Sequence, residues 1–441
     1  MSLLRLPIAA ILLSVATLAT PVRAETAITE VVSPGGITAW LVEEHSIPFV
    51  ALQLRFEGGA ALDPEGKRGA TAMMTWLLEE GAGELDSQGF AAAAESLAAS
   101  YRFDIYNDAL TVSAQVLTEN RDAALDLLRV ALTESRFDQA ALDRVRGQVL
   151  AGLRADLTDP DSIASEAFDR LTWDGHPYGS VMDGTPETVA ALTREDLFAA
   201  QKAVMARDRL FVGVVGDITG AELGPALDRL LGGLPEAGAP MPPRASYGLK
   251  PGVTVIDFDS PQSVAIFGHE GIRLDDPDYF PAMVLNEAVG GGNFASRLMD
   301  EMRERRGLTY GVGSYLQPMD LGELLVGQFA SANGKMAEAL EVVRKIWADV
   351  AANGLTETEL ADAKTYLTGA YPLRFDGNAR IANIITGMQA QGLPIDYAAT
   401  RNQKVEAVTL EDVRRVAKRL YRPQDLGFVV VGRPEGVVST P

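Results

Sequence analysis

The chain contains one internal repeat, with a fixed spacing of 216 residues. The matching segments are Gly36-Ile37-Thr38 with Gly252-Val253-Thr254, Thr193-Arg194-Glu195-Asp196 with Thr409-Leu410-Glu411-Asp412, and Val214-Val215-Gly216 with Val430-Val431-Gly432. A single triplet of this kind arises easily by chance, but three matches at one spacing do not. The spacing is also about half of the 417 residues that follow residue 24. The sequence therefore indicates two copies of one folding unit, each about 200 residues long.

The region between the two copies is rich in proline and glycine. It opens with Pro235 and contains Gly238 and Pro240-Met241-Pro242-Pro243, so it cannot continue a helix or a central strand. We therefore predict a first domain at 25–234, a linker at 235–250 and a second domain at 251–441.

Each copy is expected to have strands at both ends and helices between them. Thr193 and Thr409 are predicted helix N-caps, because acidic residues follow each threonine in the first turn. The expected strands include 51–56 and 264–267, and the expected long helices cover 122–133, 139–157, 335–352 and 357–370. This pattern predicts an α+β fold with two homologous α/β-sandwich domains, built from duplicated strand–helix units.

Residues 1–24 have the features of a secretory signal peptide. Arg5 supplies the positive charge, Leu6 to Ala19 form a mainly apolar run, and Val22-Arg23-Ala24 places small residues before a cleavage site. A retained membrane anchor is the alternative, but 14 apolar residues are fewer than the ~20 that a spanning helix needs. We expect an exported, periplasmic protein that is cleaved after Ala24 and has no stable membrane anchor.

The composition excludes several classes of site. The chain has no cysteine, which rules out disulfides, thiolate metal sites and cysteine nucleophiles. Its 60 acidic and 39 basic residues give a net charge of −21, so nucleic acid is not an expected partner. Only three histidines are present, at positions 45, 176 and 269, and they are too widely spaced to form a local metal motif.

Several motifs resemble those of the pitrilysin/insulinase-type zinc metallopeptidases, and the likeness extends over nearly the whole chain. They are Gly58-Gly59-Ala60-Ala61-Leu62-Asp63-Pro64-Glu65-Gly66-Lys67-Arg68-Gly69, His176-Pro177-Tyr178-Gly179, Asp183-Gly184-Thr185, Gly290-Gly291-Gly292-Asn293-Phe294-Ala295-Ser296-Arg297-Leu298 and the run 303–310. The resemblance implies that the two domains form one half of a clamshell. It also implies that an exported chain of this length pairs with a second chain, as the alpha-type chains of mitochondrial processing peptidase do.

The metal motif of that family is missing here. The family carries His-x-x-Glu-His on one helix, with two histidine ligands and a glutamate base. Alignment on Gly69 puts Ala72, Thr75 and Trp76 at those three positions, and Gly152 falls near the position of the third ligand, a glutamate. We therefore predict no metal and no cofactor in this chain. Residues 72–76 are expected to form an apolar core helix, with Met73 and Trp76 filling the space that metal and substrate occupy in an active relative.

Arg303 and Tyr310 are the candidate functional residues that remain. From spacing alone, residues 295–306 read as a helix that Gly307 ends, and Arg303 then only complements the helix dipole. The resemblance implies another role, because the family has an arginine and a tyrosine seven residues apart in its second domain. There they reach toward the scissile peptide, where they would position it and stabilise the oxyanion. The glycine-rich stretch 290–293 is expected to be a tight turn, with a role in substrate handling as an alternative.

Together these features suggest the non-zinc subunit of a heteromeric zinc metallopeptidase. A homologous partner bearing His-x-x-Glu-His would hold the zinc, and Arg303 and Tyr310 would complete its active site for the hydrolysis of unfolded peptides. The alternative is a catalytically inert pseudo-enzyme that binds peptides or serves as a scaffold.

Overall fold

The N-terminal half of the chain forms a six-stranded mixed sheet. The structure, a computed structural model, describes residues 27–292 and 294–440. The strands lie in the order β1-β2-β8-β3-β7-β6. Their bounds are β1 Thr29–Val32, β2 Thr38–Glu43, β3 Phe49–Glu57, β6 Ser100–Ile105, β7 Ala109–Leu117 and β8 Leu210–Gly216. A small ribbon pairs β4 Gly81–Ala82 with β5 Leu85–Asp86.

The C-terminal half repeats this sheet with five strands, in the order β11-β12-β10-β13-β9. Their bounds are β9 Gly252–Asp257, β10 Gln262–Glu270, β11 Val312–Pro318, β12 Glu323–Ala332 and β13 Gly427–Gly432. In both sheets the strand that closes the copy lies parallel to an opening strand, β8 beside β2 and β13 beside β9. Three antiparallel pairs follow in each sheet. This shared topology confirms the duplication that the repeat predicted.

The glycines of the repeated Val-Val-Gly triplets perform the same task in the two sheets. Gly216 ends β8 at a φ of 141°, and Gly432 ends β13 at a φ of 144°. A Cβ on Gly216 would lie 2.8 Å from the Cα of Val50 in β3, and a Cβ on Gly432 would lie 2.8 Å from the Cα of Ser263 in β10. Only glycine fits this conformation and this close approach. The triplets therefore recur because both copies end a central strand in the same way.

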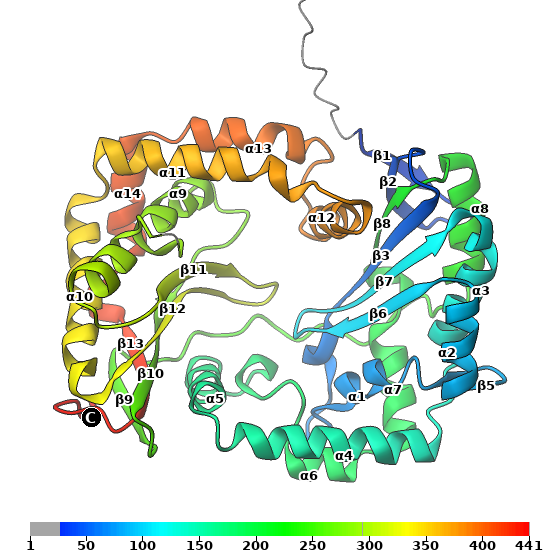
Figure 1. Cartoon of the computed structure of the whole chain (residues 1–441), viewed down its shortest axis with the longest axis horizontal. Coiled ribbons are helices and arrows are strands. Elements are labelled where there is room, and N and C mark those ends of the chain that lie inside the picture. Colours follow the sequence, from blue (N-terminus) through cyan, green and yellow to red (C-terminus); the bar gives the residue numbers. More distant parts are fainter. Residues whose placement is uncertain (1–26, 293, 441) are drawn as a thin grey trace, which may run out of the picture.

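Most of the helices lie on the outer side of a sheet, and the others lie on the inner side (Figure 1). Those of the first half are α1 Ala70–Trp76, α2 Ser87–Ser96, α3 Arg121–Thr133, α4 Gln139–Asp156, α5 Pro160–Thr172, α6 Pro186–Ala191, α7 Arg194–Val204 and α8 Gly220–Leu231. Those of the second half are α9 Tyr279–Gly290, α10 Met336–Asn353, α11 Glu357–Ala370, α12 Asn378–Ala390, α13 Tyr397–Glu406 and α14 Leu410–Leu420. Thr193 and Thr409 cap α7 and α14 as predicted, and each forms a capping box with an aspartate three residues later. The four predicted long helices form with ends shifted by at most one residue.

The two halves exchange one helix each. Helix α5, from the first half, places Ala164 and Phe168 on the inner face of the C-terminal sheet, against Val264 of β10 and Val429 of β13. Helix α12, from the second half, packs on the inner face of the N-terminal sheet. Its apolar cluster unites Ala382, Ile385 and Met388 with Trp40, Val42, Ala51 and Val215. The two helices occupy equivalent places in the repeat, so the exchange is reciprocal.

The segment before Gly307 differs from its prediction. The expected helix over 295–306 is replaced by a shorter, π-helical one, Met299–Arg305, whose turns are wider than those of an α-helix. Gly307 follows at a φ of 58°, and the backbone N–H of Leu308 donates to the carbonyl of Met302 at 2.7 Å. Tyr310 lies between this segment and β11.

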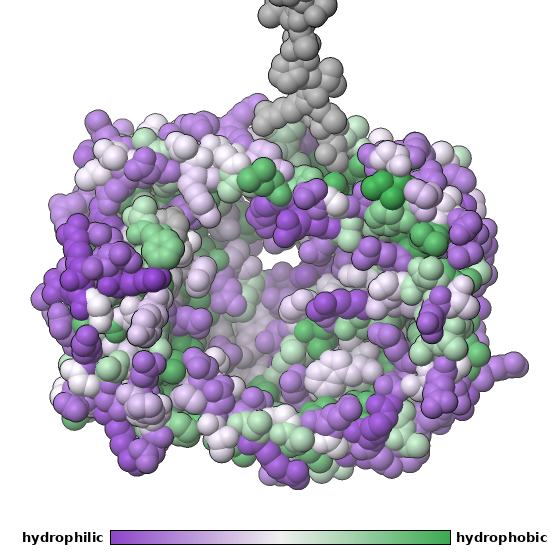
Figure 2. All heavy atoms as spheres, in the orientation of Figure 1, coloured by the Kyte–Doolittle hydropathy of each residue, from purple (hydrophilic) through white to green (hydrophobic). Residues whose placement is uncertain are grey.

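Figure 2 shows the molecule hollowed between the two halves, with a central opening visible from this side. Residues 235–250 contain no helix or strand and connect the halves. Within the described part of the chain, no helix combines the length and the apolar character needed to cross a membrane. The predicted signal peptide, residues 1–24, lies outside the described residues.

Candidate functional site

A carboxylate fixes the start of α1, the helix that carries the predicted degenerate metal positions Ala72, Thr75 and Trp76. The two oxygens of Asp63 accept hydrogen bonds from the backbone N–H groups of Gly69 and Thr71, both at 2.9 Å, and from the Thr71 hydroxyl at 2.6 Å. These bonds satisfy donors that the first turn of a helix leaves free. Gly69 has a φ of 96°, and a Cβ there would lie 2.5 Å from the carbonyl oxygen of Asp183. The motif therefore holds α1 against the loop that carries Asp183.

The structure separates the residues at the degenerate metal positions. Ala72, Met73 and Thr75 are buried in the core of the N-terminal half, and the Thr75 hydroxyl donates to the carbonyl of Thr71 at 2.7 Å. Trp76, at the last position of α1, is 37% exposed. The prediction that Met73 fills the former metal space is therefore wrong, because its side chain points into the core instead.

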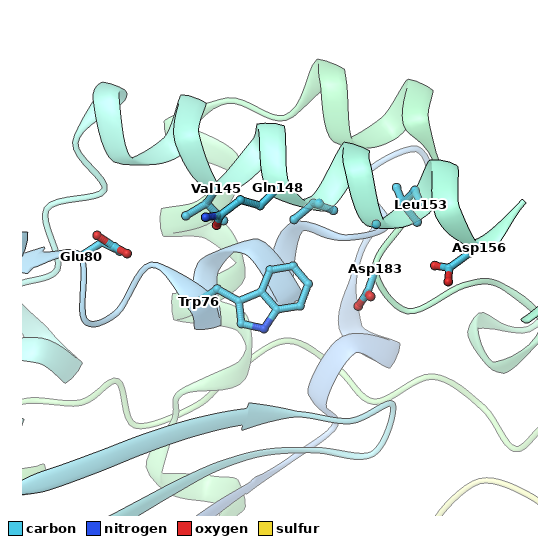
Figure 3. A pocket seen from close by; sticks show the side chains of 9 residues that line it. Trp76, Glu80, Val145, Gln148, Leu153, Asp156 and Asp183 are labelled. Carbon is cyan, nitrogen blue, oxygen red and sulfur yellow. The ribbon is translucent and has the colours of Figure 1, made fainter. Parts of the chain in front are cut away.

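Trp76 and Gly152 line one cavity of about 340 Å³ between α1 and α4. Figure 3 shows the indole below α4, with Glu80 on one side and the carboxylates of Asp183 and Asp156 on the other. The remaining lining comes from α4: Val145, Gln148, Val149 and Leu153. We call this space the Trp76 cavity.

The Trp76 cavity has acidic groups but not the ligand set of a zinc site. Over residues 27–292 and 294–440, no three histidine, cysteine, aspartate or glutamate side chains converge as a metal would require. Zinc in proteins is held by about four ligands, commonly histidine or cysteine. The residues present therefore do not fit the zinc of an active relative. Burial and the nearby charge of Asp156 raise the pKa of Asp183 above its ordinary value.

The three histidines occupy separate structural positions. His269 is fully buried in the C-terminal half, where Nδ1 contacts the carbonyl of Glu270 at 2.8 Å. His176 lies at the start of a turn and contacts the carbonyl of Pro243 at 3.0 Å. His45 is exposed and forms a 2.8 Å contact with Asp217. Each imidazole has a partner of its own, as expected for structural histidines.

Arg303 and Tyr310 lie together at the end of the π-helical segment. Both residues line two adjoining cavities of about 590 and 460 Å³. The Tyr310 side chain is 87% exposed, and the Arg303 side chain is 36% exposed. The guanidinium lies 4.7 Å from the centre of the Phe294 ring, a cation–π distance. A donor pair of this kind can hold a peptide carbonyl and stabilise charge that develops on it.

The surroundings of this pair are aromatic and glycine-rich. Phe294 and Tyr315 are both exposed, and both line the second cavity with Gly292, Gly311 and Gly313. Asp161, from the exchanged helix α5, also reaches this cavity. Asn293, the last residue of the predicted glycine-rich turn, lies outside the described residues.

The chain belongs to the insulinase (M16) peptidase family. The description "Insulinase (Peptidase family M16)" matches residues 39–185, and "Peptidase M16 inactive domain" matches residues 191–367. The first match lies within the first copy of the repeat, and the second runs from the end of the first copy through the linker into the second copy. The α+β fold with two homologous domains and the resemblance to a zinc-less member of this family are therefore confirmed.

The most similar relatives include proteins described as inactive. A non-peptidase homolog, YmxG, from Helicobacter pylori is 27% identical over 88% of this chain and 90% of its own length. An uncharacterized zinc protease from Mycobacterium leprae is 29% identical over 72% of each chain. A crystal structure of a peptidase M16 inactive domain from Pseudomonas fluorescens superimposes with a TM-score of 0.87, at 27% identity, over 94% of this chain and 99% of that one. The chain is thus similar both to proteins described as inactive and to one described as a zinc protease.

Sequence reasoning missed three features of these sites. The grouping of Asp156 and Asp183 around Trp76 depends on contacts between distant segments, and no local sequence pattern predicts it. Tyr315, whose ring is exposed, follows Tyr310 by five residues. This close spacing of two tyrosines was a signal in the sequence for an aromatic surface at the site. The arrival of Asp161 from α5 depends on the helix exchange, which the sequence does not encode locally.

Proposed function

We propose that this chain is the zinc-free subunit of a two-chain peptidase. The observation that carries the proposal is the contrast between the two halves: Trp76 and Gly152 line the former metal position without a ligand set, whereas Arg303 and Tyr310 are exposed at shared cavities. In this proposal the partner is a homologous subunit that holds zinc through His-x-x-Glu-His. Relatives named zinc proteases supply the model for such a partner.

The contribution of the pair follows from the chemistry of peptide hydrolysis. Attack on a peptide carbonyl places negative charge on its oxygen, and a phenol or guanidinium donor lowers the energy of that charge. A donor needs access to the substrate, and the exposure of Tyr310 provides it. Because the partner would contribute the metal and this chain the donors, neither chain would be active alone. The hollow between the two halves would form one side of a chamber for unfolded peptides.

The test is reconstitution with a zinc-bearing homologue encoded beside this chain. We expect the two chains to co-elute in size exclusion, to bury at least the ~1,200 Å² of a stable interface, and to cleave unfolded peptides only when combined. Full peptide turnover by the zinc-bearing chain alone would overturn the proposal. Stable association without any gain in turnover would instead support the scaffold alternative, in which the chain binds peptides or partners and has no part in catalysis.

The proposal includes export. Residues 1–24 have the charge and apolar run of a signal peptide, and their removal would leave Glu25 as the first residue. Amino-terminal sequencing of the protein recovered from the periplasm tests this point, with Glu25 as the expected first residue. An intact Met1, or recovery only in the cytoplasm, would contradict it.

A further inference from the structure

We propose that the Trp76 cavity binds the cationic end of a lysine or arginine side chain of a peptide. The inference deepens the proposed function, from which it takes only the idea that peptides are the ligands. It concerns a place where active relatives hold metal and where this chain has an indole, carboxylates and an apolar wall. Four observations support it: the exposure of the indole, the carboxylates beside it, the shape of the cavity and its position.

The indole of Trp76 is available to a ligand, unlike the other indoles of the protein. Trp40, Trp173 and Trp347 are at most 6% exposed, whereas Trp76 is 37% exposed and faces the cavity. Tryptophan is the aromatic side chain that attracts cations most strongly, through the negative face of its ring. A cation at this face replaces the metal as the positive group of the site.

The carboxylate of Asp183, beside the indole, has no hydrogen-bonded cation among the described residues. Oδ1 of Asp183 is buried and has no hydrogen-bond partner among the described residues. Arg68 is the nearby cation, but its donors are directed elsewhere. They contact the carbonyls of Ala60, Val181, Pro177 and Ser180 and the side chain of Asn107. A buried oxygen without a hydrogen bond costs free energy, and a cationic group beside this carboxylate lowers that cost.

The end of α4 adds to the negative potential. Asp156 is the last residue of this helix, where the helix dipole already favours a positive group. Its carboxylate accepts a hydrogen bond from the Ser162 hydroxyl at 3.1 Å. Glu80, at the opposite side of the cavity, forms an ion pair with Arg144 and is excluded from the proposed contact. The cation is therefore expected at the Asp156–Asp183 end.

The shape of the cavity suits a long side chain. Its volume of about 340 Å³ is small for a folded partner but ample for one side chain. Val145, Val149 and Leu153 supply an apolar wall along α4. The methylene stem of lysine or arginine can lie on such a wall while the charged end reaches the carboxylates.

The cavity is close enough to the Arg303 and Tyr310 pair for one extended peptide to contact both. Asp156 lines the Trp76 cavity, and Asp161 lines the cavity of Arg303 and Tyr310. These two aspartates are five residues apart in the chain, so their Cα atoms lie within about 18 Å of each other. A peptide of about six extended residues covers that length. The Trp76 cavity would thus select a basic residue a few positions from the site of cleavage.

The test measures peptide binding to the full mature chain without any partner. The probes are unfolded decapeptides, acetylated and amidated at their ends, which carry one lysine or arginine or, as neutral analogues, norleucine or citrulline. We expect the basic peptides to bind at least tenfold more tightly than their analogues by calorimetry, and to change the fluorescence of Trp76. A norleucine peptide with a free amino terminus is a further probe. It tests whether the cavity binds a terminal ammonium group as well as a side-chain ammonium group.

The variants Trp76→Leu, Asp183→Asn and Asp156→Asn should each reduce this preference several-fold. Glu119→Gln, which removes an exposed charge outside the lining of the cavity, is the matched control and should leave the preference unchanged. Melting curves identify any variant that fails to fold. Asp156→Asn changes an exposed residue at a helix end, so of the three variants it is expected to affect folding least. Equal affinity for lysine and norleucine peptides, or an unchanged preference in all three folded variants, would overturn the proposal. Neither result depends on the partner, so this failure is distinguishable from failure of the proposed function.

Discussion

The indole Nε1 of Trp347 donates a 3.1 Å hydrogen bond to Nε2 of His269 in the core of the C-terminal half. Because Nε2 accepts, Nδ1 must carry the proton that it donates to the carbonyl of Glu270. The imidazole is therefore held neutral, and its burial lowers its pKa to about 4.

This arrangement predicts an acid-sensitive contribution to stability. The unfolded chain protonates His269 near pH 6.5, whereas the folded protein resists protonation until about pH 4. The stabilisation is therefore complete above pH 6.5 and is lost as the pH falls from 6.5 toward 4. Between pH 7 and pH 5 we expect the free energy of unfolding to fall about 2 kcal/mol more in the wild type than in His269→Gln. Urea unfolding at both pH values measures the difference, and parallel behaviour of the two proteins would contradict it.

The loss of the Tyr310 hydroxyl should reduce peptide turnover by the reconstituted complex. Tyr310→Phe removes only the donor, and loss of an oxyanion donor costs about 10²–10³ in kcat. The zinc content of the partner should not change, because no metal ligand is altered. Tyr366→Phe, an exposed phenol on α11, serves as the control. Turnover within about twofold of the wild type would assign Tyr310 no catalytic part.

Replacement of Arg303 should affect substrate binding as well as rate. Arg303→Ala removes a guanidinium that lies over Phe294 and lines both cavities. If the group positions the peptide, KM rises in addition to any loss of kcat. Arg305→Ala, on the same π-helical segment but outside these cavities, is the matched control. Equal effects of both variants would indicate that Arg303 only complements the dipole of its helix.

The purified chain should neither bind stoichiometric zinc nor cleave peptides. Ala72 and Gly152 have no ligand atoms in their side chains, and Trp76 offers only an indole N–H. Elemental analysis after dialysis is the measurement, with the zinc-bearing partner treated in the same buffer as the positive control. One zinc per chain would refute the alignment of these positions.

The exchanged helix α5 should make a large contribution to stability. Phe168 is 2% exposed and packs on the C-terminal sheet. Phe168→Ala is expected to lower the free energy of unfolding by about 3–5 kcal/mol, as for other buried phenylalanines. Tyr366→Ala, in which an exposed ring is truncated, should cost less than about 1 kcal/mol. Denaturant unfolding of both variants compares the two losses.

Local features were predictable from the sequence, and contacts between distant segments were not. The caps at Thr193 and Thr409 and the helix Glu357–Ala370 depend on residues within one turn, so their patterns were sufficient. The hydrogen bonds of the π-helical turn before Gly307 span one residue more than those of an α-helix, and the sequence has no periodic signal for this difference.

The candidate sites were predictable to different extents. The spacing of Arg303 and Tyr310, together with a family pattern, located that pair without the structure. The neighbours of Trp76 were not accessible in the same way, because Asp156 and Asp183 meet only when α4 and the loop beyond α5 fold against α1. The inward orientation of Met73 likewise depends on the core that surrounds α1 rather than on its own segment.

The reciprocal placement of α5 and α12 limits how this protein can be divided. Either half expressed alone would leave the inner face of its sheet, with residues such as Ile266 or Trp40, open to water. A lone half could cover that face only by taking the equivalent helix from a second copy of itself, which would make it a domain-swapped dimer. The boundary between the halves is thus a boundary in sequence only, and the two halves fold together as one unit.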